Sequence, residues 1–190
     1  MKSILQLKMA FHKITLVIGL IEGGASMTIR IENMKEEHWE EVSCIYRQGI
    51  ASGQATFQRE CPSYEEWDAN HLVQCRYVAL EGEKVVGFVA ISPTSKRAVY
   101  KGVVELSIYV DEAYRGKGIG SRLMSRLCEE SEEAGFWTLY AAIIAENKAS
   151  IALHKKWGFR EIGYREKIAK DKDGIWRNMI LMERRSSKIY

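Results

Sequence analysis

The residues with the clearest chemical meaning lie in the run "RGKGIG" at positions 115–120. Three glycines stand at alternate positions, 116, 118 and 120, and this arrangement lets successive backbone N–H groups point at one place. The residues that follow carry apolar side chains at helical spacing, so the glycines precede the N-terminus of a helix. A helix N-terminus attracts anions through its free N–H groups and dipole, and Arg115 and Lys117 add positive charge. The run therefore predicts an anion site.

Two common nucleotide-binding motifs do not fit this run. A P-loop requires Ser or Thr after its lysine, but Lys117 is followed by Gly118 and Ile119. A dinucleotide-binding motif has the spacing GxGxxG after the first strand of a βαβ unit, whereas this run has GxGxG in the middle of the chain. Both interpretations are therefore disfavoured.

A carboxylate lies shortly before the anion-binding run, in the alternating segment "VVELSIYV". Period-two alternation places Glu105, Ser107 and Tyr109 on one face of a strand and apolar side chains on the other. Periodicity alone favours a solvated strand face for Glu105. The alternative is a general base next to the bound anion.

Helices and strands must position these residues. The pattern of the remaining sequence predicts that these elements form one mixed α/β domain. Alternation and turn signals indicate strands or hairpins, and helical spacing with capping signals indicates helices. Ser63 and Glu66 form a candidate capping box, and Gly135 and Gly158 end helices. The expected elements are strand 28–33, helix 35–51, helix 61–72, hairpin 77–92, a basic loop 93–101, strand 102–110, helix 118–134, strand 137–144, helix 147–157 and hairpin 159–184.

Composition limits the classes of function. The chain has 190 residues, 46% hydrophobic and 28% charged, with a net charge of +3, which indicates one globular domain and no nucleic-acid or membrane partner. The four cysteines show no CxxC spacing and the histidines do not cluster with them, so we predict no metal site. Cys44 and Cys128 fall on apolar helix stripes and are expected in the core. Reduced cysteines favour a cytoplasmic location.

Residues 1–26 look detached from the domain. The segment "ITLVIGLI" is apolar and follows lysines, so a signal peptide or a membrane-contacting helix is one interpretation. The interpretation that we favour is that Met27 is the true start, because the domain pattern begins immediately with "MTIRIENM". The predicted organisation is an extraneous segment 1–26 and a single domain 27–190.

The run "RGKGIG" after "IYVDEAY" resembles the Q/RxxGxG/A signature of the GNAT superfamily of N-acetyltransferases, with Arg115, Gly118 and Gly120 at the signature positions. The order of elements from Thr28 to about Arg184 is also similar to that family. The resemblance implies a mostly antiparallel, twisted sheet of about seven strands flanked by about four helices and splayed between strands four and five.

A closer resemblance covers nearly the whole domain. The segments "IYRQGIASGQATFQRE", "VVELSIYVDEAYRGKGIGSRLM", "NKASIALHKKWGF" and "DGIW" are similar to the phosphinothricin and methionine sulfoximine acetyltransferases. This resemblance implies transfer of acetyl from acetyl-CoA to the α-amino group of a small amino acid or analogue, by direct attack and without a metal. It also implies a homodimer and a role in resistance to such compounds.

The resemblance implies roles for individual residues. Glu105 is the general base, acting directly or through water. The cofactor-binding residues are Ile108, Tyr109 and Val110 along the pantetheine arm, Arg115, Gly116, Lys117, Gly118, Ile119 and Gly120 around the pyrophosphate, and Asn147, Ser150 and His154 on the next helix. Either His154 or Tyr109 could protonate the leaving thiolate, and Asn147 could serve only as a helix cap.

For the acceptor, the resemblance implies Phe57, Arg97 and Tyr100. A guanidinium can bind a carboxylate through two hydrogen bonds. Close relatives carry two arginines in the loop 93–101, whereas this sequence has Ser95 at the first position and Arg97 at the second.

Two other classes of function stay open. One is a GNAT enzyme that acetylates a polyamine, an aminoglycoside or a protein N-terminus. The other is a non-enzymatic acyl-CoA-binding module, against which the intact Glu105 argues.

Overall fold

The structure is a computed structural model that describes residues 28–190. The predicted extraneous segment 1–26 and the proposed start at Met27 lie outside the described residues, so the predicted domain boundary stays a prediction. Within residues 28–190, no helix combines the length and hydropathy needed to cross a bilayer. That part of the chain also holds no cluster of His, Cys, Asp and Glu side chains suited to a metal ion.

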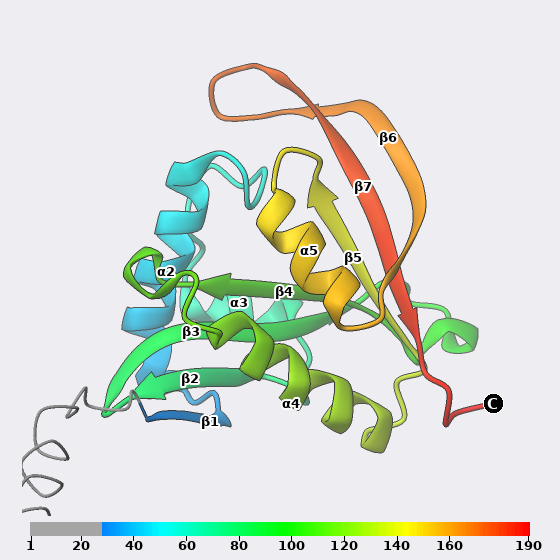
Figure 1. Cartoon of the computed structure of the whole chain (residues 1–190), viewed down its shortest axis with the longest axis horizontal. Helices are drawn as coiled ribbons and strands as arrows, with labels where there is room; N and C mark the ends of the chain where they lie inside the picture. Colours follow the sequence, from blue (N-terminus) through cyan, green and yellow to red (C-terminus); the bar gives the residue numbers. More distant parts are fainter. Residues whose placement is uncertain (1–27) are drawn as a thin grey trace, which may run out of the picture.

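Seven strands form one sheet in the order β1-β2-β3-β4-β5-β7-β6 (Figure 1). Neighbouring strands are antiparallel except β4 and β5, which are parallel. The strands are β1 (Ile29–Asn33), β2 (Tyr77–Glu81), β3 (Lys84–Pro93), β4 (Val103–Val110), β5 (Thr138–Ile144), β6 (Arg160–Lys170) and β7 (Trp176–Arg185). The predicted mixed α/β class and its mostly antiparallel sheet are confirmed.

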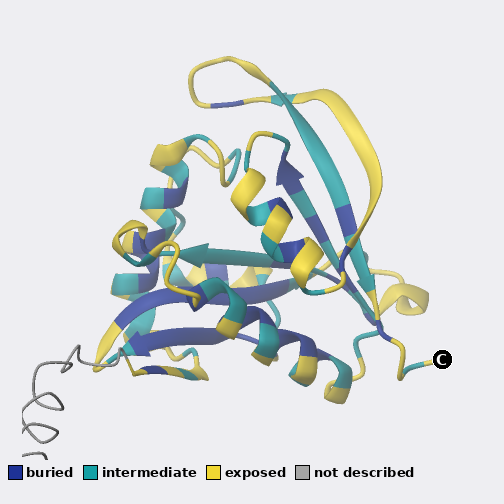
Figure 2. Ribbon diagram, viewed as in Figure 1, coloured by how far each residue is buried: buried dark blue, intermediate teal, exposed yellow. Residues whose placement is uncertain are grey.

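Helices cover both faces of the sheet (Figure 1). They are α2 (Trp39–Ser52), α3 (Tyr64–Asn70), α4 (Ile119–Glu133) and α5 (Lys148–Lys156), with 3-10 turns η1 (Glu36–His38), η2 (Ala98–Tyr100) and η3 (Glu112–Tyr114). Apolar side chains of α4 and α5 pack on one face of the sheet, and those of α2 and α3 pack on the other. The central strands are therefore buried on both sides, while β6 is exposed (Figure 2).

Local signals explain where the helices begin. The Ser63 hydroxyl accepts a hydrogen bond from the Glu66 backbone while the Glu66 carboxylate accepts one from the Ser63 N–H, which confirms the predicted capping box. Helix α4 begins after Gly118, whose φ of +82° is a left-handed conformation that favours glycine. Gly135 has a φ of +85° just after α4 ends.

The sheet splits between β4 and β5. Only three residue pairs join these strands, from Val103 with Thr138 to Glu105 with Tyr140. Beyond Glu105, β4 continues to Val110 paired with β3 alone. The β4 edge at residues 106–110 therefore faces β5 without a strand partner, as the predicted splay requires.

One prediction about the core is wrong. Cys44 is exposed, because Val42, Ile45 and Gly49 are the residues of α2 that face the sheet, and Cys44 is turned away from them. Cys128 is buried as predicted, and Cys75 joins it in the same apolar cluster. All four cysteines are free thiols.

Candidate active site

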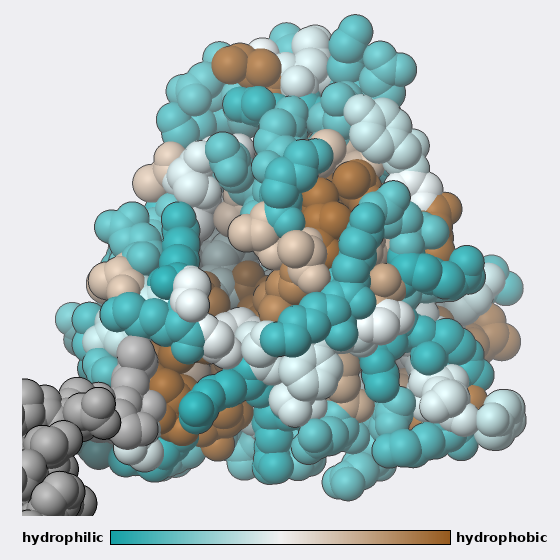
Figure 3. Space-filling model, viewed as in Figure 1, coloured by the Kyte–Doolittle hydropathy of each residue, from teal (hydrophilic) through white to brown (hydrophobic). Residues whose placement is uncertain are grey.

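A cavity of about 540 Å³ lies where β4 and β5 diverge. Its walls come from the end of α2 and the loop 53–57, from β4, from the glycine run, and from the end of β5 with the start of α5. The space-filling view shows a hollow on this face of the molecule with apolar side chains around it (Figure 3). Segments that are far apart in the sequence thus meet at the open edge of β4.

Most of the sequence-predicted site residues line this cavity. They are Phe57, Glu105, Ile108, Tyr109, Val110, Arg115, Gly116, Gly118, Ile119, Gly120, Asn147, Ser150 and His154. Three others do not line it. Lys117 lies with its ammonium 4.6 Å from the centre of the Tyr114 ring. Tyr100 is the last residue of the exposed turn η2, and Arg97 comes just before that turn. The Arg97 guanidinium lies 5.4 Å from the centre of the Tyr100 ring.

Glu105 is the carboxylate of the cavity. It is half-buried on the same strand face as Ser107 and Tyr109, at the last residue pair before the strands part. Burial raises the pKa of Glu105, and the nearby positive charge of Arg165 partly opposes that shift. A raised pKa makes a carboxylate a stronger base, which suits Glu105 to accept a proton.

Tyr109 is held firmly on the same strand face as Glu105. Its ring stacks on Phe88 with 5.1 Å between ring centres, and Tyr46 meets it edge-on at the same distance. Gly49 of α2 leaves space for this ring, since a Cβ at that position would lie 2.7 Å from a ring carbon. Burial raises the pKa of Tyr109, so its hydroxyl stays protonated and can donate.

His154 is buried and neutral. Its Nδ1 atom lies 2.7 Å from the backbone oxygen of Ser150, and because a carbonyl only accepts, Nδ1 carries the proton. Burial lowers the pKa of His154, so Nε2 is a bare acceptor. Nε2 has no hydrogen-bond partner within the described residues. In this state Nε2 of His154 is shielded from solvent and has no proton to donate.

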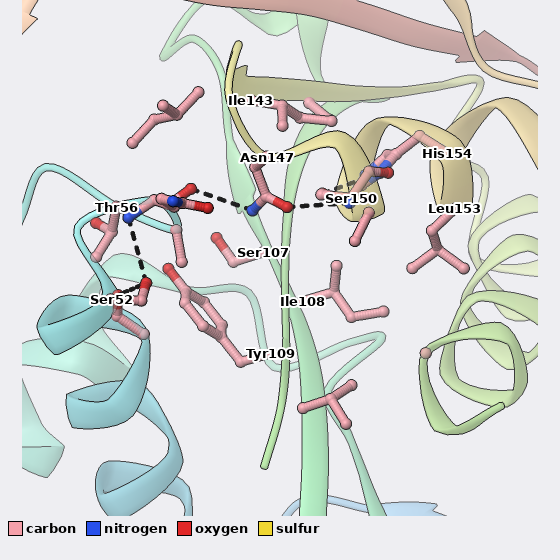
Figure 4. A pocket seen from close by; sticks show the side chains of 18 of the residues that line it. Ser52, Thr56, Ser107, Ile108, Tyr109, Ile143, Asn147, Ser150, Leu153 and His154 are labelled. Carbon is pink, nitrogen blue, oxygen red and sulfur yellow. Dashed lines mark hydrogen bonds between the residues drawn. The ribbon is translucent and has the colours of Figure 1, made fainter. Parts of the chain in front are cut away.

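Asn147 joins two walls of the cavity (Figure 4). Its Oδ1 atom accepts a hydrogen bond from the Ser150 backbone at 3.1 Å and caps α5. Its Nδ2 atom donates to the backbone oxygen of Gln54, also at 3.1 Å. The cap predicted from the sequence is present, and the same side chain also positions the loop 53–57.

The glycine run has the geometry expected for an anion site. Gly116 and Gly118 have φ angles of +76° and +82°, and apart from their neighbours in the chain nothing lies within 4 Å of where their Cβ atoms would be. Arg115 and the first residues of α4 line the cavity beside them. Free N–H groups, a helix dipole and a guanidinium thus meet at one end of the cavity.

Several lining residues were not singled out in the sequence. Ser52 and Thr56 come from the end of α2 and the loop after it, and Ala142 and Met179 come from β5 and β7. Ser52 and Thr56 lie within the segment 45–60 that resembles the family, but nothing in that segment marked these two positions. Only the register of the sheet brings Met179, opposite Ile144, to the cavity. A prediction of strand pairing would have found Met179, whereas for Ser52 and Thr56 the available signal was the resemblance of the whole segment 45–60.

The fold and the site define the class of protein. The chain belongs to the acetyltransferase (GNAT) family, whose model matches residues 31–159. This membership confirms the resemblance found in the sequence and identifies the chain as an enzyme of the N-acetyltransferase class.

Particular relatives narrow the comparison. The phosphinothricin N-acetyltransferase of Streptomyces coelicolor is 30% identical over 140 residues, which cover 69% of this chain and 82% of that protein. The L-methionine sulfoximine/L-methionine sulfone acetyltransferase of Pseudomonas aeruginosa is 33% identical over 100 residues, which cover 53% and 58%. The crystal structure of a phosphinothricin acetyltransferase from Sinorhizobium meliloti in complex with acetyl-CoA has a TM-score of 0.76 and 28% identity, over 86% of this chain and 91% of that one.

Proposed function

We propose that this protein transfers acetyl from acetyl-CoA to the α-amino group of a small amino acid or analogue of the phosphinothricin and methionine sulfoximine type. One observation carries the proposal: Glu105 lies in the cavity at the point where the β4 edge becomes free. A base is thus placed beside an unpaired strand edge that can hold an extended amide ligand. The named relatives support the acceptor class.

Residues of the cavity fit acetyl-CoA. The free backbone groups of residues 106–110 match the amides of a pantetheine arm, and His154 is among the residues that line the cavity. Arg115 and the glycine run offer cationic and N–H groups to the pyrophosphate. Acetyl-CoA supplies the acetyl group as a thioester.

The proposed chemistry follows from these positions. Glu105 accepts a proton from the acceptor's ammonium, directly or through water, and the free amine attacks the thioester carbon in a ternary complex. Backbone N–H groups of β4 stabilise the developing oxyanion. As the carbon–sulfur bond breaks and the amide forms, Tyr109 is the group suited to protonate the thiolate, since its hydroxyl is protonated and His154 lacks a proton at Nε2. The second proton that the nitrogen loses restores the Tyr109 hydroxyl, so that Glu105 retains the first proton until it passes to solvent.

The test is CoA release with a panel of acceptors: phosphinothricin, methionine sulfoximine, methionine sulfone, ordinary amino acids, a polyamine, an aminoglycoside and a peptide. We expect turnover with the methionine-like compounds. Glu105→Gln should lower kcat/KM by at least about a hundredfold while leaving acetyl-CoA affinity unchanged. Turnover confined to the peptide or the polyamine would move the acceptor to another class. Acetyl-CoA binding without any turnover would leave the binding-module alternative.

The homodimer also belongs to this proposal. The β6–β7 hairpin exposes large apolar side chains, among them Tyr164 and Trp176, which are 60% and 53% exposed. Such side chains gathered on a hairpin at the edge of the sheet are typical of a surface that a second subunit covers. Light scattering on the purified protein measures the mass directly, and a monomer would contradict the proposal.

A further inference from the structure

Arg165 lies on the same face of the sheet as Glu105, although three strand-to-strand steps separate β6 from β4. Arg165 is opposite Met179 of β7, and Met179 is opposite Ile144 of β5. Tyr140 shares a strand face with Ile144, since side chains alternate with a period of two, and Tyr140 is opposite Glu105. Arg165 is not itself a lining residue, but its neighbours on this path are, because Met179, Ile144 and Glu105 line the cavity.

The Arg165 guanidinium is close enough to act on the cavity. Its positive charge lowers the pKa of Glu105 and that of Tyr140, both of which burial raises. Arg97, by contrast, lies on the exposed turn η2 and stacks on Tyr100. Arg165 is thus the arginine of the described chain whose charge is felt at the candidate base.

Arg165 is also free to take a ligand. Within residues 28–190 it forms no hydrogen bond to another side chain and no ion pair, and its side chain is exposed. The neighbouring arginines of the hairpin are occupied: Arg160 pairs with Glu183, and Arg177 pairs with Asp171 at 2.7 Å. Arg184 pairs with Glu132, and Arg185 donates to two backbone oxygens. Among the arginines of this hairpin, Arg165 is therefore the one left without a hydrogen-bond or ion-pair partner, and it lies on the face that holds Glu105.

We propose that Arg165 binds the carboxylate of the acceptor, so that the site selects free α-amino acids over amines that lack a carboxylate. This inference rests on the proposed function and names a residue that determines its specificity. An α-amino acid carries an ammonium and a carboxylate on one carbon, and a neighbouring glutamate and arginine complement that pair of charges. A guanidinium can bind the carboxylate through two parallel hydrogen bonds, which a lysine cannot reproduce.

The experiment compares methionine sulfone with 3-(methylsulfonyl)propylamine, the same molecule without its carboxylate. Rates are measured at about pH 8.5, far above the ordinary pKa of a glutamate, so that Glu105 is ionised in every variant. Arg165→Gln should raise KM for methionine sulfone by about tenfold or more, with kcat within about twofold. Its kinetics with the amine should not change. Arg165→Lys should have a KM for methionine sulfone between that of the wild type and that of Arg165→Gln.

Lys167→Gln is the matched control, because it removes one positive charge from the same strand. The Lys167 side chain is 68% exposed, and its nearest carboxylate is Glu166 at 3.9 Å. This variant should behave as wild type with both acceptors. Binding of acetyl-CoA, measured by titration, should be the same in all variants, which verifies that each is folded.

The outcomes either support or overturn the role of Arg165 in binding the acceptor carboxylate. An unchanged KM in Arg165→Gln, or an equal loss with both acceptors, overturns the role of Arg165 while the proposed function stands. Wild-type turnover of the amine but of no free amino acid overturns both. A rise in KM confined to the carboxylate-bearing acceptor supports the inference.

Discussion

Asn147 donates a hydrogen bond from Nδ2 to the backbone oxygen of Gln54, a residue 93 positions earlier in the chain, at 3.1 Å (Figure 4). The bond links the start of α5, on one side of the cavity, to the loop 53–57 on the other. The same side chain caps α5 through Oδ1. One residue therefore stabilises a helix and also fixes the separation of two cavity walls.

Substitution can separate these two roles of Asn147. Asn147→Asp keeps an oxygen for the cap but loses the donor to Gln54, whereas Asn147→Ala loses both. We expect Asn147→Ala to lower the free energy of unfolding by about 1 kcal/mol, and Asn147→Asp to lower it less. Both should raise KM for the acceptor, because the loop 53–57 is released. Urea unfolding and acceptor kinetics test this, and an unchanged KM in Asn147→Asp would show that the link has no role in binding.

The two glycines that flank α4 offer a matched pair. Gly118 and Gly135 both have left-handed φ angles and open space at the Cβ position, but only Gly118 lines the cavity. Alanine at either position should cost about 1–2 kcal/mol of stability through backbone strain. Calorimetric titration should show weaker acetyl-CoA binding for Gly118→Ala alone. Equal affinities in the two variants would argue against the placement of the pyrophosphate.

Gly49→Ala sets helix propensity against packing. Alanine favours a helix over glycine by about 1 kcal/mol, yet its Cβ would lie 2.7 Å from the Tyr109 ring. That ring is clamped between Tyr46 and Phe88 and cannot move away freely. The cost of overpacking should exceed the gain in helix propensity, so that chemical denaturation shows a free energy of unfolding lower by about 1–3 kcal/mol. The value of kcat should also fall. Glu40→Ala, on the exposed side of the same helix, should leave both unchanged. A stabilised Gly49→Ala would mean that Tyr109 is mobile.

Stability should depend on pH through two histidines, the buried His154 and the half-buried His71. Burial lowers the pKa of His154 and that of His71 in the folded state. Below the unfolded value of about 6.5 the unfolded chain binds more protons, so the free energy of unfolding should fall as the pH drops through that value. His154→Asn keeps a donor for the Ser150 oxygen but does not titrate. Between about pH 7.5 and 5.5, the unfolding midpoint of His154→Asn should change less than that of the wild type. An equal change in both proteins would exclude His154 as a source of the pH dependence of stability.

The framework was predictable from the sequence because its signals are local. The Ser63 and Glu66 capping box, the Asn147 cap and the glycine before α4 each act within one turn of chain, and the structure contains all three. The exposed Cys44 was mispredicted because an apolar residue beside a helix stripe does not reveal the phase of the helix. Contacts between strands that are distant in the sequence could not be predicted in this way. Met179 and Arg165 join the site only through the register of β5, β7 and β6, which involves residues far apart in the sequence.

The three residue pairs between β4 and β5 have a mechanical consequence. They are the whole ladder between the half of the sheet that ends at β4 and the half that begins at β5. An extended ligand lying along residues 106–110 would continue that ladder and act as a temporary eighth strand. A ligand in the cavity would then join the two halves of the sheet, so that the free energy of unfolding of the whole domain rises when the co-substrate is bound.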